Sequence, residues 1–157
     1  MPIFNVVLFN PQIPPNTGNI MRLCMNTNNK LHIIKPMGFE INEKSLRRAG
    51  MDYIKNTEIV IYENFEHFIE INNKERFFIV TKFGSKKYTD LKYKRGDFFI
   101  FGSESNGIPQ LILEKVKESS KIFIPMAPKN RCLNLSNAVS IIIYEAARQN
   151  DFMFGKL

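Results

Sequence analysis

Short apolar runs alternate along this chain with segments whose apolar residues recur at helical spacing. The apolar runs are typical of strands buried on both faces, and they cover residues 3–9, 31–36, 58–62, 76–82, 97–102 and 121–125. Helical spacing follows the first run, around Ile20 and Leu23, and it recurs in residues 42–50, 63–73, 109–117 and 136–149. This alternation predicts an α/β fold, with a largely parallel sheet of about six strands flanked by helices.

The length of the chain suits one globular domain. It has 157 residues, 44% of them hydrophobic, and no internal repeat, low-complexity tract or linker, so we expect a single domain over residues 1–157. No apolar run approaches the roughly 20 residues that cross a bilayer, and the first residues lack a basic stretch and a cleavage site. We therefore expect no membrane association and a cytoplasmic location.

The metal-binding residue types are sparse. Cys24 and Cys132 form no C-x-x-C motif, and we expect both to be reduced thiols. His32 and His67 lie far apart in the sequence, and neither has a cysteine or carboxylate at ligand spacing. We expect no metal site.

The charge of the chain favours a polyanionic partner. Its 22 Lys and Arg residues outnumber its 15 Asp and Glu residues, which gives a formal net charge of +7. Two sequence clusters hold much of the excess: Lys44, Arg47 and Arg48 form one, and Lys82, Lys86, Lys87, Lys92, Lys94 and Arg95 form the other. Either cluster alone is equally typical of a solvated surface, but the overall excess favours nucleic acid.

The segment FGSESNGIP, residues 101–109, contains a G-x-x-x-x-G core after a predicted strand. A phosphate-binding P-loop requires Lys and then Ser or Thr after its second glycine, and this chain has Ile108 and Pro109. Gly102 and Gly107 would let the backbone approach a ligand closely, without a phosphate-binding lysine. The alternative is a simple turn between strand and helix. Ligands of parallel sheets bind beyond the carboxyl ends of strands, which is where this segment lies.

Three segments together carry a resemblance to a known family. They are NPQIPPNTGNIMRLCMNT (residues 10–27), FGSESNGIP, and IPMAPKNRCLNLSNAVSIIIYEAARQ (residues 124–149). Their order, content and position resemble the three motifs of the SPOUT superfamily of S-adenosylmethionine-dependent RNA methyltransferases. The resemblance covers essentially the whole chain, and it is strongest to the TrmL/YibK-type tRNA 2'-O-methyltransferases. It implies an α/β fold with a deep trefoil knot in the C-terminal third, and a homodimer.

The resemblance also implies which residues bind the donor, S-adenosylmethionine, which becomes S-adenosylhomocysteine after transfer. The expected contacts, many of them through the backbone, are Val80, Thr81, Gly102, Glu104, Gly107, Ile124, Met126, Cys132 and Leu133. Relatives usually have serine at the position of Cys132. A thiol forms weaker hydrogen bonds than a hydroxyl, which puts a side-chain role at that position in doubt.

For catalysis the resemblance points to Arg22, with Asn16, Asn19, Asn134 and Ser136 around it. A guanidinium resists deprotonation, so we expect Arg22 to bind RNA phosphate and stabilise oxyanion character. Proton removal would then pass to Glu104 or to water. On the terminal helix, Tyr144 is expected near a partner subunit, so that Arg22 of one subunit completes the site of the other.

The expected reaction is 2'-O-methylation of the wobble-position ribose, cytidine or modified uridine, in the anticodon stem-loop of tRNA, with leucine tRNAs as substrates. Unstacked bases in that loop can be splayed out and read by a small domain. Ser103 and Asn106 replace the Pro and Arg of close relatives, which weakens the case for the same substrate. Two alternatives stay open: a ribosomal RNA 2'-O-methyltransferase of the same superfamily, and a non-catalytic RNA-binding or nucleotide-binding domain.

Overall fold

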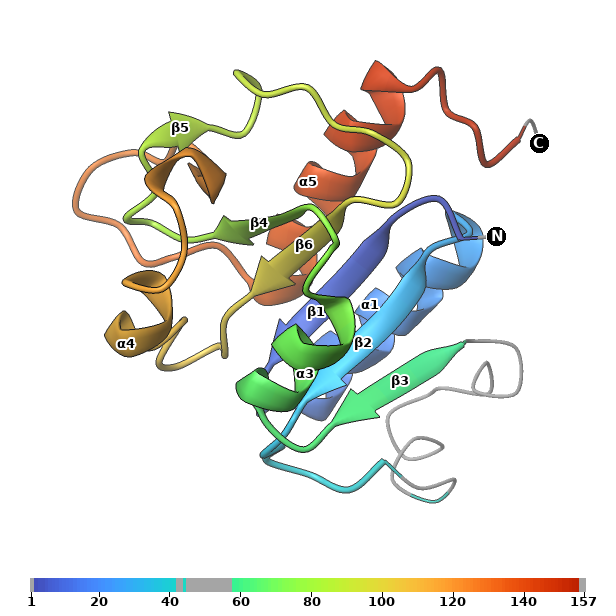
Figure 1. The fold of residues 1–157 in the computed structure, drawn as a ribbon, viewed down its shortest axis with the longest axis vertical. Coiled ribbons are helices and arrows are strands. Elements are labelled where there is room, and N and C mark those ends of the chain that lie inside the picture. The colour runs from blue at the N-terminus through green and yellow to red at the C-terminus, as the bar shows by residue number, and fades with distance from the viewer. Residues whose placement is uncertain (1, 42–43, 45–57, 156–157) are drawn as a thin grey trace.

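The computed structural model describes residues 2–41, 44 and 58–155, and within them seven strands form one parallel sheet (Figure 1). The strands are β1 (Asn5–Phe9), β2 (Lys30–Ile34), β3 (Ile59–Tyr62), β4 (Phe77–Val80), β5 (Lys86–Lys87), β6 (Phe98–Phe101) and β7 (Lys121–Phe123). Their order across the sheet is β3-β2-β1-β6-β4-β7-β5. All neighbouring strands of this sheet are parallel, as the apolar runs predicted.

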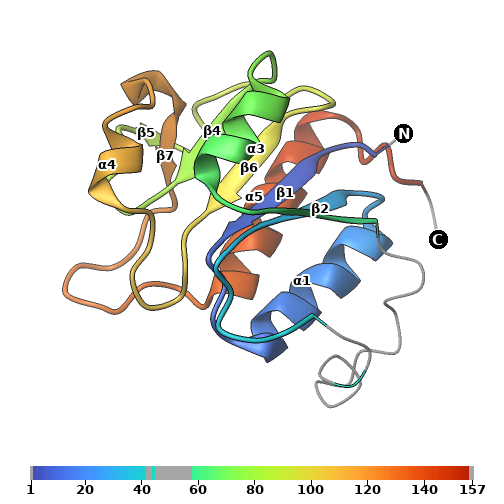
Figure 2. The same cartoon turned by 60° about the horizontal axis from the view of Figure 1, so that its bottom comes forward.

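Helices cover both faces of the sheet (Figures 1 and 2). They are α1 (Pro14–Asn26), α3 (Phe65–Asn72), α4 (Gln110–Leu113) and α5 (Leu135–Gln149), with a short 3₁₀ helix at Glu118–Ser120. Helices α1 and α5 pack in one apolar cluster and α3 and α4 in the other. Among the residues described, none of the helices combines the length and the apolar character that a membrane crossing requires.

Side-chain alternation along the strands explains why the sequences of the central strands are largely apolar. In β1, Val6 and Leu8 belong to the cluster with α1 and α5, whereas Val7 and Phe9 belong to the cluster with α3 and α4. Successive side chains of a strand point to opposite faces, and both faces here are covered by helices. A central strand therefore has no position for solvent, and all five residues of β1 are buried.

Two expected elements have different bounds in the structure, and one strand was not expected. Helix α1 begins at Pro14, inside the segment read as a loop, because proline suits the first turn of a helix, where its missing N–H is not needed. Helix α4 ends at Leu113 rather than near Lys117, since only Ile112 and Leu113 of its residues are buried. Strand β5 was not predicted because its two exposed lysines show no apolar pattern. The helix expected over residues 42–50, with Arg47 and Arg48, lies outside the described residues except for Lys44, which is helical.

Strand β7 lies between β4 and β5, and the short connection between those two strands crosses over it. Val80 of β4 and Lys86 of β5 both pair with Ile122, from opposite sides. The residues between them, 81–85, are called the crossing turn below. A Cβ at Gly84 would lie 2.4 Å from the carbonyl carbon of Ile122, so only glycine fits where the turn passes the strand.

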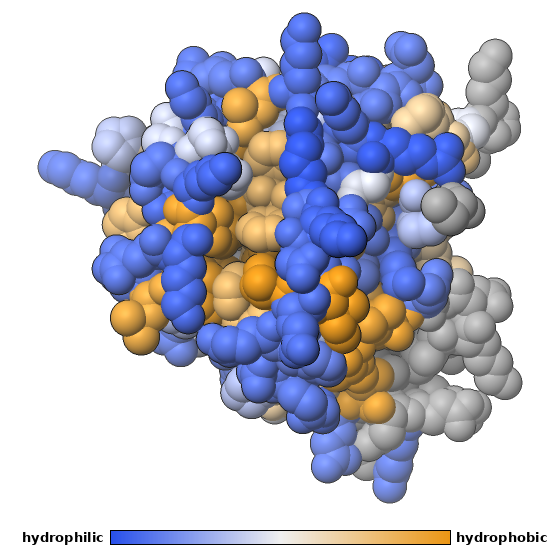
Figure 3. Space-filling view, viewed as in Figure 1, coloured by the Kyte–Doolittle hydropathy of each residue, from blue (hydrophilic) through white to orange (hydrophobic). Residues whose placement is uncertain are grey.

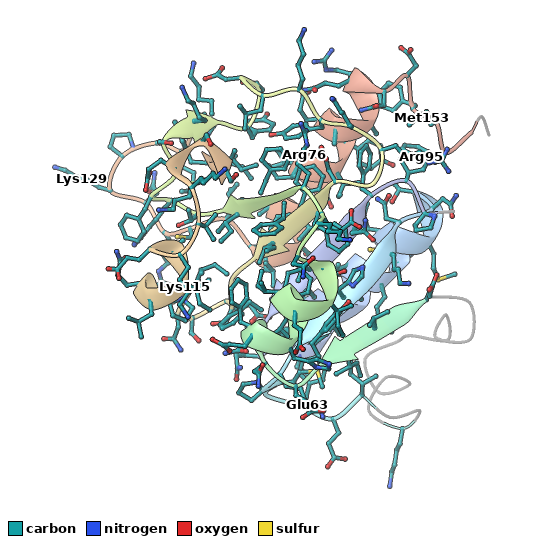
Figure 4. All side chains as sticks on the ribbon, viewed as in Figure 1. Glu63, Arg76, Arg95, Lys115, Lys129 and Met153 are labelled. Carbon is teal, nitrogen blue, oxygen red and sulfur yellow. The ribbon has the colours of Figure 1, made fainter. Side chains whose placement is uncertain are left out.

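Hydrophilic side chains cover most of the face seen in Figure 3. Among the labelled cations of Figure 4, Lys115 and Lys129 extend away from the ribbon. Arg76 instead lies against the sheet, where its Nε and Nη2 donate to the two carboxylate oxygens of buried Asp97, both at 2.8 Å. The lysines of the second predicted basic cluster are all exposed, so they are available to a polyanion.

Candidate active site

A cavity of about 630 Å³ opens beyond the carboxyl ends of β4, β6 and β7. Its walls come from the crossing turn, the loop after β6 and the long loop between β7 and α5. All nine residues expected to bind the donor line it: Val80, Thr81, Gly102, Glu104, Gly107, Ile124, Met126, Cys132 and Leu133. Parallel strands end together at one edge of a sheet, which is why residues more than fifty positions apart meet here.

The loop of residues 102–108 closes on itself. Ser103 N–H donates to the Gly107 carbonyl at 3.3 Å, and Gly107 N–H donates to the Ser103 carbonyl at 3.0 Å. A Cβ at Gly102 would lie 2.3 Å from the Gly107 carbonyl carbon, so glycine is required there by the loop rather than by a ligand. Gly107 differs, because its φ of +64° favours glycine while a Cβ would meet nothing within 4 Å. Its open side faces no protein atom.

Glu104 joins this loop to the segment before α1. Its carboxylate oxygens accept from the backbone N–H of Gln12 at 2.8 Å and of Ile13 at 3.0 Å. One of them also accepts from Asn16 Nδ2 at 3.3 Å. Those two amides precede α1, whose N-cap residue, Ile13, has no side-chain cap, so the carboxylate satisfies donors that the helix start leaves open.

Asn16 and Asn134 continue the connection to the third motif. Asn134 Nδ2 donates to Asn16 Oδ1 at 2.9 Å, across 118 positions of sequence. Asn134 is also the N-cap of α5, and its Oδ1 accepts from the backbone N–H of Ser136 and Asn137 and from Ser136 Oγ at 2.6 Å. Glu104, Asn16, Asn134 and Ser136 thus form one hydrogen-bonded chain through all three motifs.

Two of the predicted catalytic residues do not line the cavity. Ser136 lies one step behind Asn134, as its hydrogen bond shows. Arg22 is exposed on α1, six residues after Asn16, which is about 9 Å along a helix axis. Asn19 is exposed on the same helix. Within one chain, Asn16, Glu104 and Asn134 come together at the cavity, while Arg22 and Asn19 lie apart from it.

The two cysteines have opposite surroundings and are both free. Cys132 is exposed in the cavity wall. Cys24 is fully buried in α1, and burial raises the pKa of its thiol to about 12. In the part of the chain that the structure describes, no group of three or more His, Cys, Asp or Glu residues could hold a metal ion.

The sequence did not single out several lining residues. The wall also includes Ile13, Lys82, Phe83, Phe101, Ile108, Asn130, Arg131, Leu135 and Ala138. Ile13 and Leu135 come from positions that only the tertiary structure brings near the strand ends. Lys82 ends a run predicted as a strand and Phe83 directly follows it, and that position was the available signal, because side chains at strand ends meet at one edge.

Comparisons with known proteins agree with this geometry. The family model described as the SpoU rRNA Methylase family matches residues 3–144. A tRNA (cytidine(34)-2'-O)-methyltransferase of Escherichia coli K12 is 48% identical over 147 residues, 94% of each chain. A protein of the same name from Saccharophagus degradans is 45% identical and covers 98% of this chain and 100% of its own.

Solved structures show the same fold. A candidate RNA methyltransferase from Bacillus anthracis superposes with a TM-score of 0.89 at 43% identity, covering 95% of both chains. A structure from work on the 2-OH methylation of C/U34 on tRNA has a TM-score of 0.87 at 34% identity, covering 94% of this chain and 96% of its own. The resemblance to SPOUT methyltransferases is confirmed, and the chain belongs to the SpoU rRNA Methylase family.

Proposed function

We propose that this chain is a methyltransferase that transfers a methyl group from S-adenosylmethionine to the 2'-hydroxyl of the wobble ribose of tRNA, at cytidine or uridine 34. The observation that carries the proposal is the set of near full-length relatives, 40–48% identical, which are named tRNA (cytidine(34)-2'-O)-methyltransferases. The cavity supports it, because all nine expected donor contacts line one space.

The cavity fits the donor in size and chemistry. A volume of about 630 Å³ lies within the range of roughly 300–1,000 Å³ that small-molecule sites occupy. Val80, Phe101 and Ile124 give it apolar walls for an adenosyl group, and Glu104 is its acidic lining residue, which suits a cation. The open side of Gly107 leaves the backbone accessible. The donor supplies an electrophilic methyl group on its sulfonium, so the protein must chiefly align the acceptor hydroxyl.

Arg22 is proposed to bind the RNA phosphate and to stabilise negative charge developing on the ribose oxygen. Both carboxylate oxygens of Glu104 already accept from backbone N–H groups, which favours water over Glu104 as the proton acceptor. Asn16 and Asn134 are proposed to position the ribose, and Ser136 to hold Asn134 through its hydroxyl.

We propose that the chain acts as a homodimer, and the position of Arg22 supports this proposal. Its place outside the cavity wall of its own chain supports a site that Arg22 of the other subunit completes. Tyr144 of α5 is exposed, as are Phe152 and Met153 just after this helix, and these side chains supply apolar surface for such a contact. Packing α5 against a partner would bring the two chains together close to their cavities.

Further properties are proposed from the same resemblance. We propose one domain, a cytoplasmic location beside tRNA, leucine tRNAs as substrates, and a trefoil knot in the C-terminal third. The position of β7 between β4 and β5 supports the knot, because the crossing turn encloses the strand that leads into α5.

The reaction can be tested by incubating the chain with tritiated donor and either bulk tRNA or ribosomal RNA. Label in tRNA, mapped to the ribose of nucleotide 34 and enriched in leucine tRNAs, is the expected result. The name of the family model favours ribosomal RNA as the second candidate, and label only there would establish it. Donor binding without transfer to either RNA would indicate a binding module.

The catalytic roles can be separated by rate profiles against pH for Arg22→Lys and Glu104→Gln. We expect Arg22→Lys to lower the rate while its profile keeps the shape of the wild type. Loss of the basic limb only in the Arg22 variant would contradict the assignment, since it would make the guanidinium itself the proton acceptor.

A further inference from the structure

The crossing turn, residues 81–85, carries an aromatic side chain that the fold holds in solvent. Phe83 is 68% exposed, although it follows the end of β4 by only three residues. Single exposed apolar residues are common and carry no meaning alone. Phe83 differs because its backbone is fixed on both sides.

Three backbone hydrogen bonds fix this turn. Thr81 N–H donates to the Ile122 carbonyl at 2.9 Å, Gly84 N–H donates to the Thr81 carbonyl at 3.0 Å, and Ser85 N–H donates to the Lys121 carbonyl at 3.1 Å. Gly84 also lies in direct contact with the backbone of Ile122. Lys82 and Phe83 therefore form the tip of a turn that is tied to β7 at both ends, which fixes the backbone from which the ring extends.

The same turn forms part of the cavity wall. Thr81, Lys82 and Phe83 all line the cavity. The Lys82 ammonium lies 5.0 Å from the centroid of the Phe83 ring, over its face. The ring remains 68% exposed with that ammonium present, so aromatic surface is left for a second flat partner. Lys86 and Lys87 follow on the exposed edge strand β5.

We propose that Phe83 stacks on a nucleobase of the RNA next to the nucleotide whose ribose is methylated, with Lys82 contacting the adjoining phosphate. This inference rests on the proposed function and adds the way in which the flanking base is held. A flat aromatic ring with a cation beside it is the arrangement that single-stranded nucleic acid recognises through stacking and backbone charge. Its place in the wall of the donor cavity puts that base beside the reacting ribose.

The test uses the full chain and two anticodon stem-loop RNAs, with 2-aminopurine on the 5' or the 3' side of nucleotide 34. This base loses fluorescence when it stacks, and RNA affinity is measured in parallel by anisotropy. The variants are Phe83→Ala, Phe83→Leu and Phe83→Trp. Ile71→Ala is the matched control, since Ile71 is 60% exposed on α3 and does not line the cavity.

We expect wild type and Phe83→Trp to quench one of the two probes. Phe83→Ala and Phe83→Leu should bind RNA about tenfold more weakly and leave that probe bright, because leucine is apolar but cannot stack. Ile71→Ala should match wild type. The affinity for S-adenosylhomocysteine, measured by calorimetry, should stay unchanged in all four variants.

Three results would overturn the inference. The first is that Phe83→Ala binds RNA as tightly as wild type, and the second is that Phe83→Leu does so. The third is a loss of donor affinity while RNA affinity stays intact, which would place the ring over the donor. The binding assay requires no methyl transfer, so it remains decisive if the proposed function fails. That failure is seen separately, as absence of label in tRNA with the wild-type chain.

Discussion

At the scale of single residues, the two thiols differ in their access to solvent. Cys132 is exposed in the cavity wall, while Cys24 is fully buried and burial raises the pKa of its thiol to about 12. Since the thiolate is the reactive form, an alkylating reagent should modify Cys132 and leave Cys24 intact in the folded chain. The buried thiol therefore serves as an internal control for unfolding.

We predict that donor binding protects Cys132 from alkylation. The rate of iodoacetamide addition, followed by intact mass, should fall with the unoccupied fraction, about tenfold when S-adenosylhomocysteine is at ten times its Kd. Adenosine at a concentration that does not bind should give no protection. An alkylation rate that is independent of bound ligand would remove Cys132 from the donor site.

At the same scale, sequence reasoning identified residue types better than their roles. Gly102 and Gly107 were both expected to admit a ligand, yet the close approach of Gly107 to Gly102 shows that one glycine serves the loop itself. Glu104 was expected at the donor, and its bonds to the N–H groups of Gln12 and Ile13 were not foreseen. Such bonds depend on the relative placement of two loops, which no local pattern contains.

At the scale of elements, the start of α5 combines capping with a tertiary link, and a substitution can separate the two. Asn134→Asp keeps an oxygen that accepts from the N–H groups of Ser136 and Asn137, and its charge suits a helix N-terminus. The aspartate cannot donate to Asn16 Oδ1. The Asn16 carbonyl oxygen then either faces an anion, or the Asn16 amide rotates and its hydrogen bond to Glu104 is lost. Asn134→Ala loses both functions.

We predict that Asn134→Ala lowers the free energy of unfolding by about 1–2 kcal/mol, and that Asn134→Asp lowers it by less, because the retained helix cap partly offsets the lost hydrogen bond to Asn16. Both variants should lose most methyl transfer, because both break the contact with Asn16. Urea unfolding and single-turnover transfer measure the two effects. Normal transfer by Asn134→Asp would show that the link to Asn16 plays no part in the reaction.

A buried histidine in β2 forms hydrogen bonds to the neighbouring strands β1 and β3. His32 of β2 contacts Asn5 Oδ1 through Nε2 and the Tyr62 hydroxyl through Nδ1, both at 3.0 Å. Since Oδ1 can only accept, Nε2 carries the proton and Nδ1 accepts from Tyr62. Burial, with a smaller contribution from the Lys30 ammonium, lowers the pKa of His32 from 6.5 to about 4.

We predict that stability falls on acidification between pH 6.5 and about pH 4. In this window the unfolded chain binds a proton at His32 that the folded chain does not, so unfolding is favoured as pH falls, by up to about 3 kcal/mol. Above pH 6.5 the residue contributes no pH dependence. Urea unfolding at pH 7.5 and 5 should show a smaller difference for His32→Gln, and an equal difference would contradict the assignment.

The sequence was most reliable for the types of the long elements and least reliable for the short ones. The six apolar runs all became strands, because both faces of the central sheet are covered and most strand positions are therefore apolar. Strand β5 was missed because two lysines are held there by pairing with Ile122 and Phe123, not by their own preference. Helix α4 was expected to be longer because helical spacing alone does not show where burial ends.

At the scale of the whole molecule, the proposed dimer has a direct test at the exposed end of α5. Tyr144 is 47% exposed, and its ring lies edge-on to Phe154 at 5.9 Å between centroids. A charge placed in an apolar contact between subunits is costly to bury, whereas on a free surface it is not. Association and activity should therefore change together at this position.

We predict that Tyr144→Glu sediments as a monomer and loses methyl transfer while retaining donor affinity. The reason is that Arg22 of one subunit then no longer lies at the cavity of another. Ile71→Glu, at an exposed apolar position of α3, is the control and should remain active. In addition, a mixture of Arg22→Ala and Asn134→Ala chains should regain activity that neither has alone. Full activity in a monomeric variant would contradict the shared site.

The sequence by itself determined the order of strands and helices, the basic character of the chain and the residues of its three motifs, since periodicity and motif spacing are local properties. The tertiary structure decided which of those residues meet. Asn16 contacts Glu104 across 88 positions and Asn134 across 118, and the crossing turn is held by a strand formed nearly forty residues later. Such contacts depend on strand order and register, which are set by packing both faces of one sheet at once.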